Sequence, residues 1–205
     1  LDLICGNYGT SNEIYLNDGG NLSSTADWQT SNTLDTMAIE VGDIDGDGRI
    51  DIVFGNTAGN ENELYLNSED GLESSPSWTS SNGQDTVSVA LGDVDGDGNL
   101  DLFVGNGNQQ PDELYLNAES LGHFSSSSAW IASENSSTNI VKWGDVDNDG
   151  DLDIVIAKNS YVEVFLNQLD DGGAGADGLP DIDIGGPSDS DSGTSGTNLA
   201  TAYSH

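Results

Sequence analysis

The chain contains almost no basic residues and very little cysteine or histidine. Its 205 residues include 3 Lys+Arg, 2 His and 1 Cys, against 37 Asp+Glu, which gives a formal net charge of -34. Nucleic acids and anionic membranes bind basic surfaces, so neither is expected as a partner. The single cysteine, Cys5, excludes an internal disulfide framework and any zinc site built from several thiolates.

Long hydrophobic runs are also absent. No apolar stretch approaches the roughly 18 residues of a membrane-spanning helix. The chain opens directly on the strand-like sequence LDLICGN, which we interpret as the start of a processed chain or of a fragment. What remains is an acidic, Gly-rich chain whose carboxylates need a counter-charge, and metal cations or high salt are the natural candidates.

A unit of about 50 residues recurs along the chain. Its first motif contains Gly-Asp-x-Asp and ends on an apolar stretch, and its second motif has the form Asn-Glu-Leu-Tyr-Leu-Asn. The first motif occupies residues 38–56, 88–106 and 140–158, with its end repeated at 1–7. The second occupies residues 12–17, 62–67, 112–117 and 161–167. The copies therefore span about 1–34, 35–84, 85–136 and 137–167, followed by a Gly/Ser/Asp-rich tail at 168–205.

Each unit is expected to contain four strands. Val87, Val89 and Leu91 alternate with smaller or polar residues, which is the pattern of a half-buried strand. The apolar stretch LDLFVGN and the segment ELYLN give two more strands, and the recurring tryptophans Trp28, Trp78 and Trp130 mark a fourth. The sequence thus predicts an all-β protein, a β-propeller of four four-stranded repeats whose blades stack to bury their faces.

The turn between the first two strands of a unit contains the candidate metal ligands. It reads D-x-D-x-D-G-x-x-D at Asp43–Asp51, Asp93–Asp101 and Asp145–Asp153. Carboxylates at positions 1, 3, 5 and 9, with a backbone carbonyl at position 7, would surround one hard cation with oxygen atoms. Ca²⁺ accepts six to eight oxygens in flexible geometry, whereas Mg²⁺ demands a tighter octahedron, so calcium fits this loop better.

The two alternatives to such a site are an EF-hand loop and a turn that binds no metal. An EF-hand loop needs a bidentate Glu at position 12, where this chain has Phe54, Val104 and Ile156, and it needs helical flanks. The other alternative is a metal-free turn, because Asp and Gly are good turn formers. Three copies that each keep all four Asp residues favour the metal site.

With these motifs the chain resembles the FG-GAP/VCBS repeat family over roughly residues 1–167. The resemblance implies a calcium-loaded β-propeller of the kind found in integrin α-subunits and in many secreted bacterial and archaeal proteins, with a structural ion in each loop. The first copy keeps only Asp2 of the loop and is expected to hold no ion unaided. The ligands that the resemblance implies are Asp43, Asp45, Asp47, Asp51 and the Arg49 carbonyl; Asp93, Asp95, Asp97, Asp101 and the Asn99 carbonyl; and Asp145, Asp147, Asp149, Asp153 and the Asp151 carbonyl.

The tail contains a possible fifth, degenerate copy of the first motif. Asp177–Ile182 repeats the end of the calcium motif, within a strand-like segment at 177–186. The tail either closes its own propeller or adds a strand to the open edge of a neighbouring subunit. The second arrangement predicts self-association into a filament.

The function expected from the sequence is that of a non-enzymatic, calcium-stabilised structural or adhesive module. An extracellular or cell-surface location is expected, because calcium is abundant there and scarce in the cytosol. The partners would be Ca²⁺, further copies of the chain, and a surface protein or glycan. The alternative function is that of a carbohydrate-binding lectin, with aromatic and Asn/Asp residues of the loops between strands as its site. No serine or cysteine has an identifiable His base, so an enzyme on this scaffold is the weakest reading.

Overall fold

The computed structural model describes residues 1–117, 122–133 and 135–167. Every regular element among them is a β-strand, so the predicted all-β class is confirmed for this part of the chain. The strand-like segment predicted at 177–186 lies outside the described residues.

The strands form four antiparallel sheets, one for each copy of the repeat, which we call blades 1 to 4. Blade 1 contains β1 (Leu3–Cys5), β2 (Glu13–Tyr15) and β5 (Trp28–Gln29). Blade 2 contains β6 (Thr36–Gly42), β7 (Asp51–Asn56), β8 (Glu63–Tyr65) and β11 (Trp78–Thr79). Blade 3 contains β12 (Thr86–Gly92), β13 (Asp101–Asn106), β14 (Glu113–Tyr115) and β15 (Trp130–Ile131). Blade 4 contains β16 (Thr138–Gly144), β17 (Asp153–Lys158) and β18 (Val162–Phe165).

Two short hairpins lie outside the blades. The first pairs β3 (Asn17–Asp18) with β4 (Asn21–Leu22), and the second pairs β9 (Asn67–Ser68) with β10 (Gly71–Leu72).

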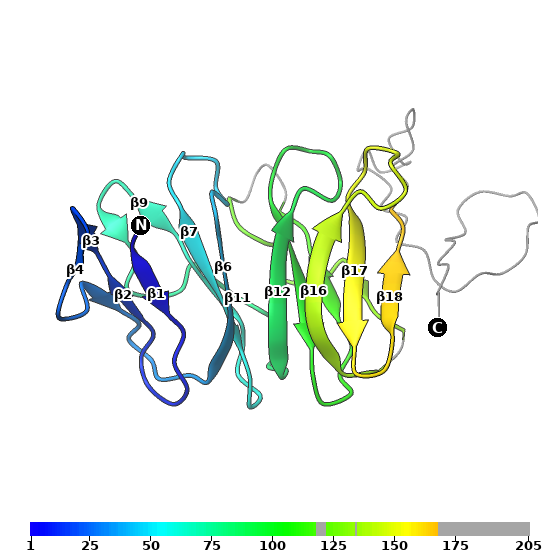
Figure 1. The fold of residues 1–205 in the computed structure, drawn as a ribbon, viewed down its shortest axis with the longest axis horizontal. Coiled ribbons are helices and arrows are strands. Elements are labelled where there is room, and N and C mark those ends of the chain that lie inside the picture. Colours follow the sequence, from blue (N-terminus) through cyan, green and yellow to red (C-terminus); the bar gives the residue numbers. More distant parts are fainter. Residues whose placement is uncertain (118–121, 134, 168–205) are drawn as a thin grey trace, which may run out of the picture.

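The prediction of four strands per repeat holds for blades 2 and 3. Within the described residues, blade 1 has the three strands β1, β2 and β5. Blade 4 likewise has three strands, β16, β17 and β18, in the part of the chain that the structure describes. The blades stand in an open row from blade 1 to blade 4, with β6, β12 and β16 as neighbouring first strands (Figure 1).

The hydrophobic core lies between the blades. Side chains alternate along each strand, so one set points to the preceding blade (the rear face) and the other to the following blade (the forward face). On β7, Ile52 and Phe54 pack with residues of blade 1, whereas Val53 packs with residues of blade 3. All three are at most 3% exposed. Stacking therefore buries both faces of blades 2 and 3, as expected of a repeat that cannot bury them alone.

Glycine allows the blades to approach closely. A Cβ atom at Gly55 would lie 2.8 Å from Cγ2 of Thr86 in the next blade, and one at Gly105 would lie 2.7 Å from Cγ2 of Thr138. Both distances are shorter than packed carbon atoms tolerate. Blade 4 has Ala157 at this repeat position.

The recurring tryptophans also pack between blades. Trp28 stacks on Phe54 of blade 2 with ring centroids 6.5 Å apart. Trp78 meets Tyr115 of blade 3 edge to face at 5.2 Å, and Trp130 meets Phe165 of blade 4 at 5.4 Å. The regularly spaced tryptophans therefore contribute to the packing between neighbouring blades.

A buried ion pair joins blades 3 and 4. Lys158 Nζ lies 2.5 Å from Asp112 Oδ2, and both side chains are almost fully buried. Lys158 also donates to Thr138 Oγ1 at 2.8 Å. In blades 2 and 3 the residues at the Lys158 position are Asn56 and Asn106, which accept hydrogen bonds from Thr36 and Thr86.

Candidate metal centres

Each Asp-rich loop connects the first strand of a blade to the second. The first loop leaves β6 at Gly42 and enters β7 at Asp51, and the other two repeat this arrangement in blades 3 and 4. The position-6 glycines Gly48, Gly98 and Gly150 have φ values of 87°, 93° and 104°. L-residues rarely adopt this conformation, so glycine is needed to turn position 7 inward. At position 4 the third loop has Asn148, where the other two loops have Gly46 and Gly96. Asn148 has a φ of 64°, a conformation that Asn tolerates better than most residues.

Hydrogen bonds inside the loops pre-form their shape. In the first loop, Asp43 Oδ2 accepts from Gly48 N at 2.9 Å, and Asp45 Oδ1 accepts from Asp47 N at 3.1 Å. The second loop repeats both bonds with Asp93 and Asp95 as acceptors. In the third loop, Asp145 Oδ1 accepts from Asp149 N at 3.1 Å. These bonds turn the carboxylates at positions 1 and 3 toward the same space.

The structure brings together the carboxylates at positions 1, 3 and 9. In each loop, one oxygen atom from each of these three residues lies within 4.8 Å of the others. The triads are Asp43, Asp45 and Asp51; Asp93, Asp95 and Asp101; and Asp145, Asp147 and Asp153.

The position-5 carboxylates are outside these triads. In the first loop, Asp47 Oδ2 pairs with Arg49 Nη1 at 2.6 Å. In the second, Asp97 Oδ2 accepts from Asn99 Nδ2 at 2.9 Å. The ligand roles of Asp47, Asp97 and Asp149, and of the Arg49, Asn99 and Asp151 carbonyls, stay predictions.

Unsatisfied oxygens indicate that a cation fits the loops. Oδ1 of Asp43 and Oδ1 of Asp93 are buried and have no hydrogen-bond partner within the described part of the chain. A buried carboxylate oxygen without a partner is costly, because it has lost its water. A hard cation that prefers carboxylate oxygens would satisfy both atoms.

The electrostatics of the loops agree with this fit. Burial, together with the charges of neighbouring Asp residues, raises the pKa of Asp101 to about 7 and that of Asp95 to about 6. Burial also raises the pKa of Asp51. Several carboxylates crowded into a poorly hydrated space therefore resist ionisation, and a divalent cation would remove that resistance.

The repeats match a known family model. The model of the FG-GAP-like repeat matches residues 1–54, 43–104 and 93–156. The chain belongs to the FG-GAP-like repeat family. A search of curated proteins finds no sequence match. In the described part of the chain, no helix is long and apolar enough to span a membrane.

A ninth-position Asp anchors each FG-GAP-like repeat by hydrogen bonds to the backbone. Asp101 is fully buried, and its Oδ2 accepts from Val94 N at 2.9 Å while its Oδ1 accepts from Asn117 N at 2.8 Å. Asp51 and Asp153 make the same pair of contacts in their own blades. This residue therefore ties the loop to the end of the second motif.

The asparagine that ends the second motif was not recognised from the sequence as part of the site. Its side chain reaches the loop of the preceding repeat: Asn117 Nδ2 donates to Ile44 O, and Asn167 Nδ2 donates to Val94 O, both at 2.7 Å. The recurrence of Asn17, Asn67, Asn117 and Asn167 was the available signal. Asn117 and Asn167 therefore each join two neighbouring FG-GAP-like loops, whereas Asn17 and Asn67 donate to Leu1 O and Ile50 O within their own blades.

The third loop is more exposed than the other two. Ile44 and Val94, at position 2 of the first and second loops, are 2% and 0% exposed, whereas Val146 is 49% exposed. The first two loops are covered by the blade that follows them, and no described residue plays that part for the third.

Proposed function

We propose that the chain is a non-enzymatic, calcium-stabilised structural or adhesive module that works outside the cell or at its surface, with its blades forming part of a β-propeller. The observation that carries this proposal is the threefold recurrence of a carboxylate triad at one place in stacked FG-GAP-like repeats. Two of the triads hold a buried oxygen that needs a partner.

The ion's role in this proposal is structural. Each triad lies in the hairpin that connects the first and second strands of a blade, so an ion bound there would pin the two strands together. The ninth-position Asp and the cross-blade asparagine extend this effect to the next blade. Positions 1, 3 and 9 would supply carboxylate ligands, and position 5 and the position-7 carbonyl would complete the shell.

The proposed location follows from the calcium concentration on the two sides of the cell membrane. Loops of ordinary affinity are filled at the millimolar calcium found outside cells and are largely empty in the cytosol. FG-GAP-like repeats typically occur in extracellular or surface proteins and are generally non-enzymatic, which supports both parts of the proposal.

Self-association into a filament belongs to this proposal, with the tail as one connecting element. Its support is the alternating sequence of the segment at 177–186, which lies outside the described residues. The lectin function gains no such support, because a sugar-stacking tryptophan needs a free ring face. Trp28, Trp78 and Trp130 are engaged with aromatic residues of the following blade.

Calcium titration by calorimetry, together with thermal melting, tests the proposal. We expect about three calcium ions per chain and a large fall in melting temperature in excess chelator. An ion that binds only the folded state adds about 2.7 kcal/mol per site at a hundredfold excess over its Kd. Asp95→Asn should remove or weaken one site, whereas Asp70→Asn, on an exposed turn, should remove none. Melting that is unchanged by chelator, or equal binding by Mg²⁺ and Ca²⁺, would contradict a calcium-specific structural role.

A further inference from the structure

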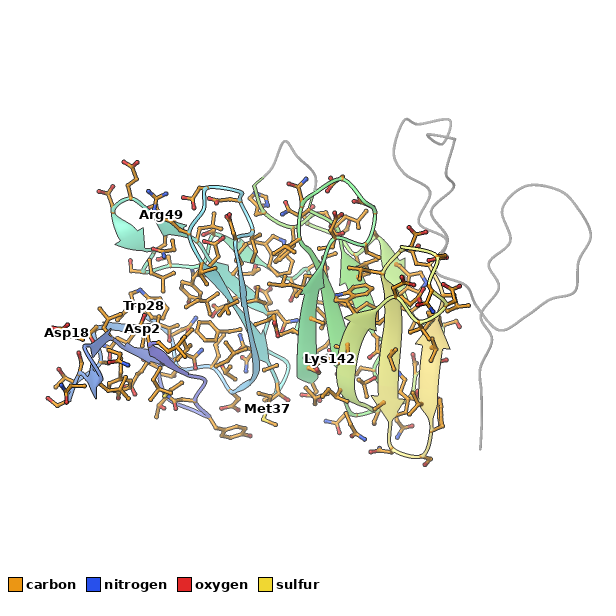
Figure 2. All side chains as sticks on the ribbon, turned by 45° about the horizontal axis from the view of Figure 1, so that its top comes forward. Asp2, Asp18, Trp28, Met37, Arg49 and Lys142 are labelled. Carbon is orange, nitrogen blue, oxygen red and sulfur yellow. The ribbon has the colours of Figure 1, made fainter. Side chains whose placement is uncertain are left out.

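The three Asp-rich loops lie side by side at the same end of the blades (Figure 1). Figure 2 shows Arg49 of the first loop at this end, whereas Met37, near the start of β6, lies at the opposite end. Each loop contains one carboxylate triad, and the ninth-position Asp of each triad accepts a hydrogen bond from the position-2 amide of its own loop. This arrangement allows direct contacts between one loop and the blade that follows it.

Hydrogen bonds connect the first triad to the second. Asp51 Oδ2 accepts from Ile44 N at 2.8 Å, and Ile44 O accepts from Asn117 Nδ2 at 2.7 Å. The backbone amide of Asn117 then donates to Asp101 Oδ1 at 2.8 Å. Ile44 and Asn117 thus connect a carboxylate of one triad to a carboxylate of the next.

The same contacts connect the second triad to the third. Asp101 Oδ2 accepts from Val94 N at 2.9 Å, and Val94 O accepts from Asn167 Nδ2 at 2.7 Å. The backbone amide of Asn167 donates to Asp153 Oδ1 at 2.8 Å. Asp101 therefore uses one oxygen atom in each connection, and the second triad is linked to both of its neighbours.

Both connections are shielded from water. Ile44 and Val94 are 2% and 0% exposed, and Asn117 and Asn167 are each 1% exposed. Ile44 and Val94 also belong to the hydrophobic clusters that each loop shares with the blade that follows it. A buried carbonyl that loses its donor finds no water to replace it, so breaking either bond is costly. A shift of one loop is therefore unfavourable unless its neighbour shifts with it.

We propose that the three loops bind calcium with positive coupling, transmitted by Asn117 and Asn167 and centred on the second triad. The inference rests on the proposed function, because it takes calcium as the ion of the loops. The crowded carboxylates of a loop repel one another, and a cation that joins them orders the loop. An ordered second loop fixes Asp101, the backbone of Asn117 and the carbonyl of Val94. The neighbouring loops then have less freedom to lose on binding, which raises their affinity.

Coupling of this kind is reciprocal. By thermodynamic linkage, the first loop raises the calcium affinity of the second by the same factor as the second raises that of the first. Coupling between the first and third loops passes through both connections, so it should be lost when either asparagine is removed. The second triad should therefore have the largest influence on the other two.

Charge alone would give coupling of the opposite sign. A divalent cation in one loop reduces the negative potential that attracts calcium to the next loop, so purely electrostatic coupling would be negative. At about 1 M salt the Debye length is about 3 Å, which largely screens this effect between exposed charges. The hydrogen bonds of Asn117 and Asn167 are buried and keep their effect. Positive coupling at high salt is therefore what distinguishes the hydrogen-bonded connections from charge.

Site-resolved calcium titration by NMR, in about 1 M potassium chloride, tests the coupling. The backbone amides of Ile44, Val94 and Val146 each donate to the ninth-position carboxylate of their own triad, so their signals report the three loops separately. In the unsubstituted chain we expect the Ile44 and Val94 signals to titrate together, with a Hill coefficient above unity. This first result does not depend on the folding of any variant.

Asp95→Asn weakens the second site and tests the effect on both neighbours. The calcium Kd of the first and third loops should rise at least about fivefold, the lower end of typical couplings between sites. The charge control is Asp70→Asn, which removes the same charge from an exposed turn and should leave both Kd values unchanged.

The two asparagines separate the connections. When Asp95→Asn is added to Asn117→Ala, the Kd of the first loop should no longer change, whereas that of the third loop should still rise. Adding Asp95→Asn to Asn167→Ala should give the reverse pattern. Asn67→Ala is the matched control, because Asn67 donates to Ile50 O within its own blade. In that background Asp95→Asn should act on both neighbours as it does in the unsubstituted chain.

The outcomes separate the coupling from the proposed function. Independent saturation of the three signals by calcium would overturn the coupling and leave the proposed function intact. An effect of Asp95→Asn on the first loop that persists in Asn117→Ala would do the same, because it would show another route between the loops. Signals that do not respond to calcium at all would overturn both.

Discussion

Asn117 in blade 3 donates its side-chain amide to the carbonyl oxygen of Ile44 in the Asp-rich loop of blade 2, at 2.7 Å. Its backbone amide donates to Asp101, a member of the carboxylate triad of its own blade, at 2.8 Å. Since Asp51 in turn accepts from the backbone amide of Ile44 at 2.8 Å, hydrogen bonds run without a break from one triad to the next. The order of one loop therefore supports the order of its neighbour.

Asn117→Ala tests this connection. The variant removes a buried hydrogen bond and leaves Ile44 O without its donor, which should lower the free energy of unfolding by about 1–3 kcal/mol. It should also weaken calcium binding by the first loop. The control is Asn67→Ala, because Asn67 occupies the same repeat position and its amide donates only within blade 2, at 3.2 Å and partly in solvent. Equal effects of the two substitutions in calorimetric titration would show that the cross-blade bond is not what matters.

A second prediction concerns the spacing of blades. A Cβ at Gly92 would lie 2.8 Å from Cδ1 of Trp143 in blade 4, whereas one at Gly144, the same repeat position, would have no atom within 4 Å. Gly92→Ala should therefore destabilise the fold by about 1–3 kcal/mol through overpacking. Gly144→Ala should be neutral or slightly stabilising, because the unfolded chain loses freedom. Urea denaturation measures both, and equal loss of stability in the two variants would refute the close packing at Gly92.

The repeats, their strands and the Asp-rich loops could be predicted from the sequence, because they depend on local patterns. Alternation along Val87–Leu91 indicates a strand, and Asp and Gly at fixed spacing indicate the loop. The recurrence of Trp28, Trp78 and Trp130 indicated a fourth strand in the same way. These features repeat about every 50 residues, so the strands and loops assigned in one copy are supported by the same pattern in the other copies.

Contacts between blades could not be predicted in the same way, because they join residues far apart in the chain. Asn117 and Ile44 are 73 positions apart, and Lys158 and Asp112 are 46 apart. Asp112 lies in the second motif of its repeat, and nothing in its sequence position points to Lys158. The structure shows Asp112 fully buried against Lys158, so an Asp112 substitution tests the interface between blades 3 and 4.

A third prediction concerns salt. Three bound divalent cations would offset only six of the charges that make up the formal -34, so self-repulsion persists in the calcium-loaded protein. With calcium held saturating, melting temperature and solubility should rise as sodium chloride increases from about 0.1 M to about 1 M, because screening shortens the range of that repulsion. A melting temperature that is indifferent to ionic strength would contradict this account of the acidic composition.

The last prediction concerns the buried ion pair between blades 3 and 4. Lys158→Asn alone leaves the Asp112 carboxylate buried without its cation, and Asp112→Asn alone leaves the Lys158 ammonium without its anion. Each should cost about 3–5 kcal/mol of stability.

The double variant, Asp112→Asn with Lys158→Asn, separates the charge pair from its position in the repeat. It reproduces the residues that other blades use, since Asn62 occupies the Asp112 position and Asn56 and Asn106 occupy the Lys158 position. Between blades 1 and 2 the same two positions hold Asn12 and Asn56. Thr36 Oγ1 accepts from Asn12 Nδ2 at 2.9 Å and donates to Asn56 Oδ1 at 2.7 Å, so a neutral pair can bridge two blades. The double variant should therefore recover most of the stability that either single substitution removes, as measured by urea denaturation in a double-mutant cycle. Losses that simply add would mean that the two side chains act independently, and that the ion pair does not hold blade 4 against blade 3.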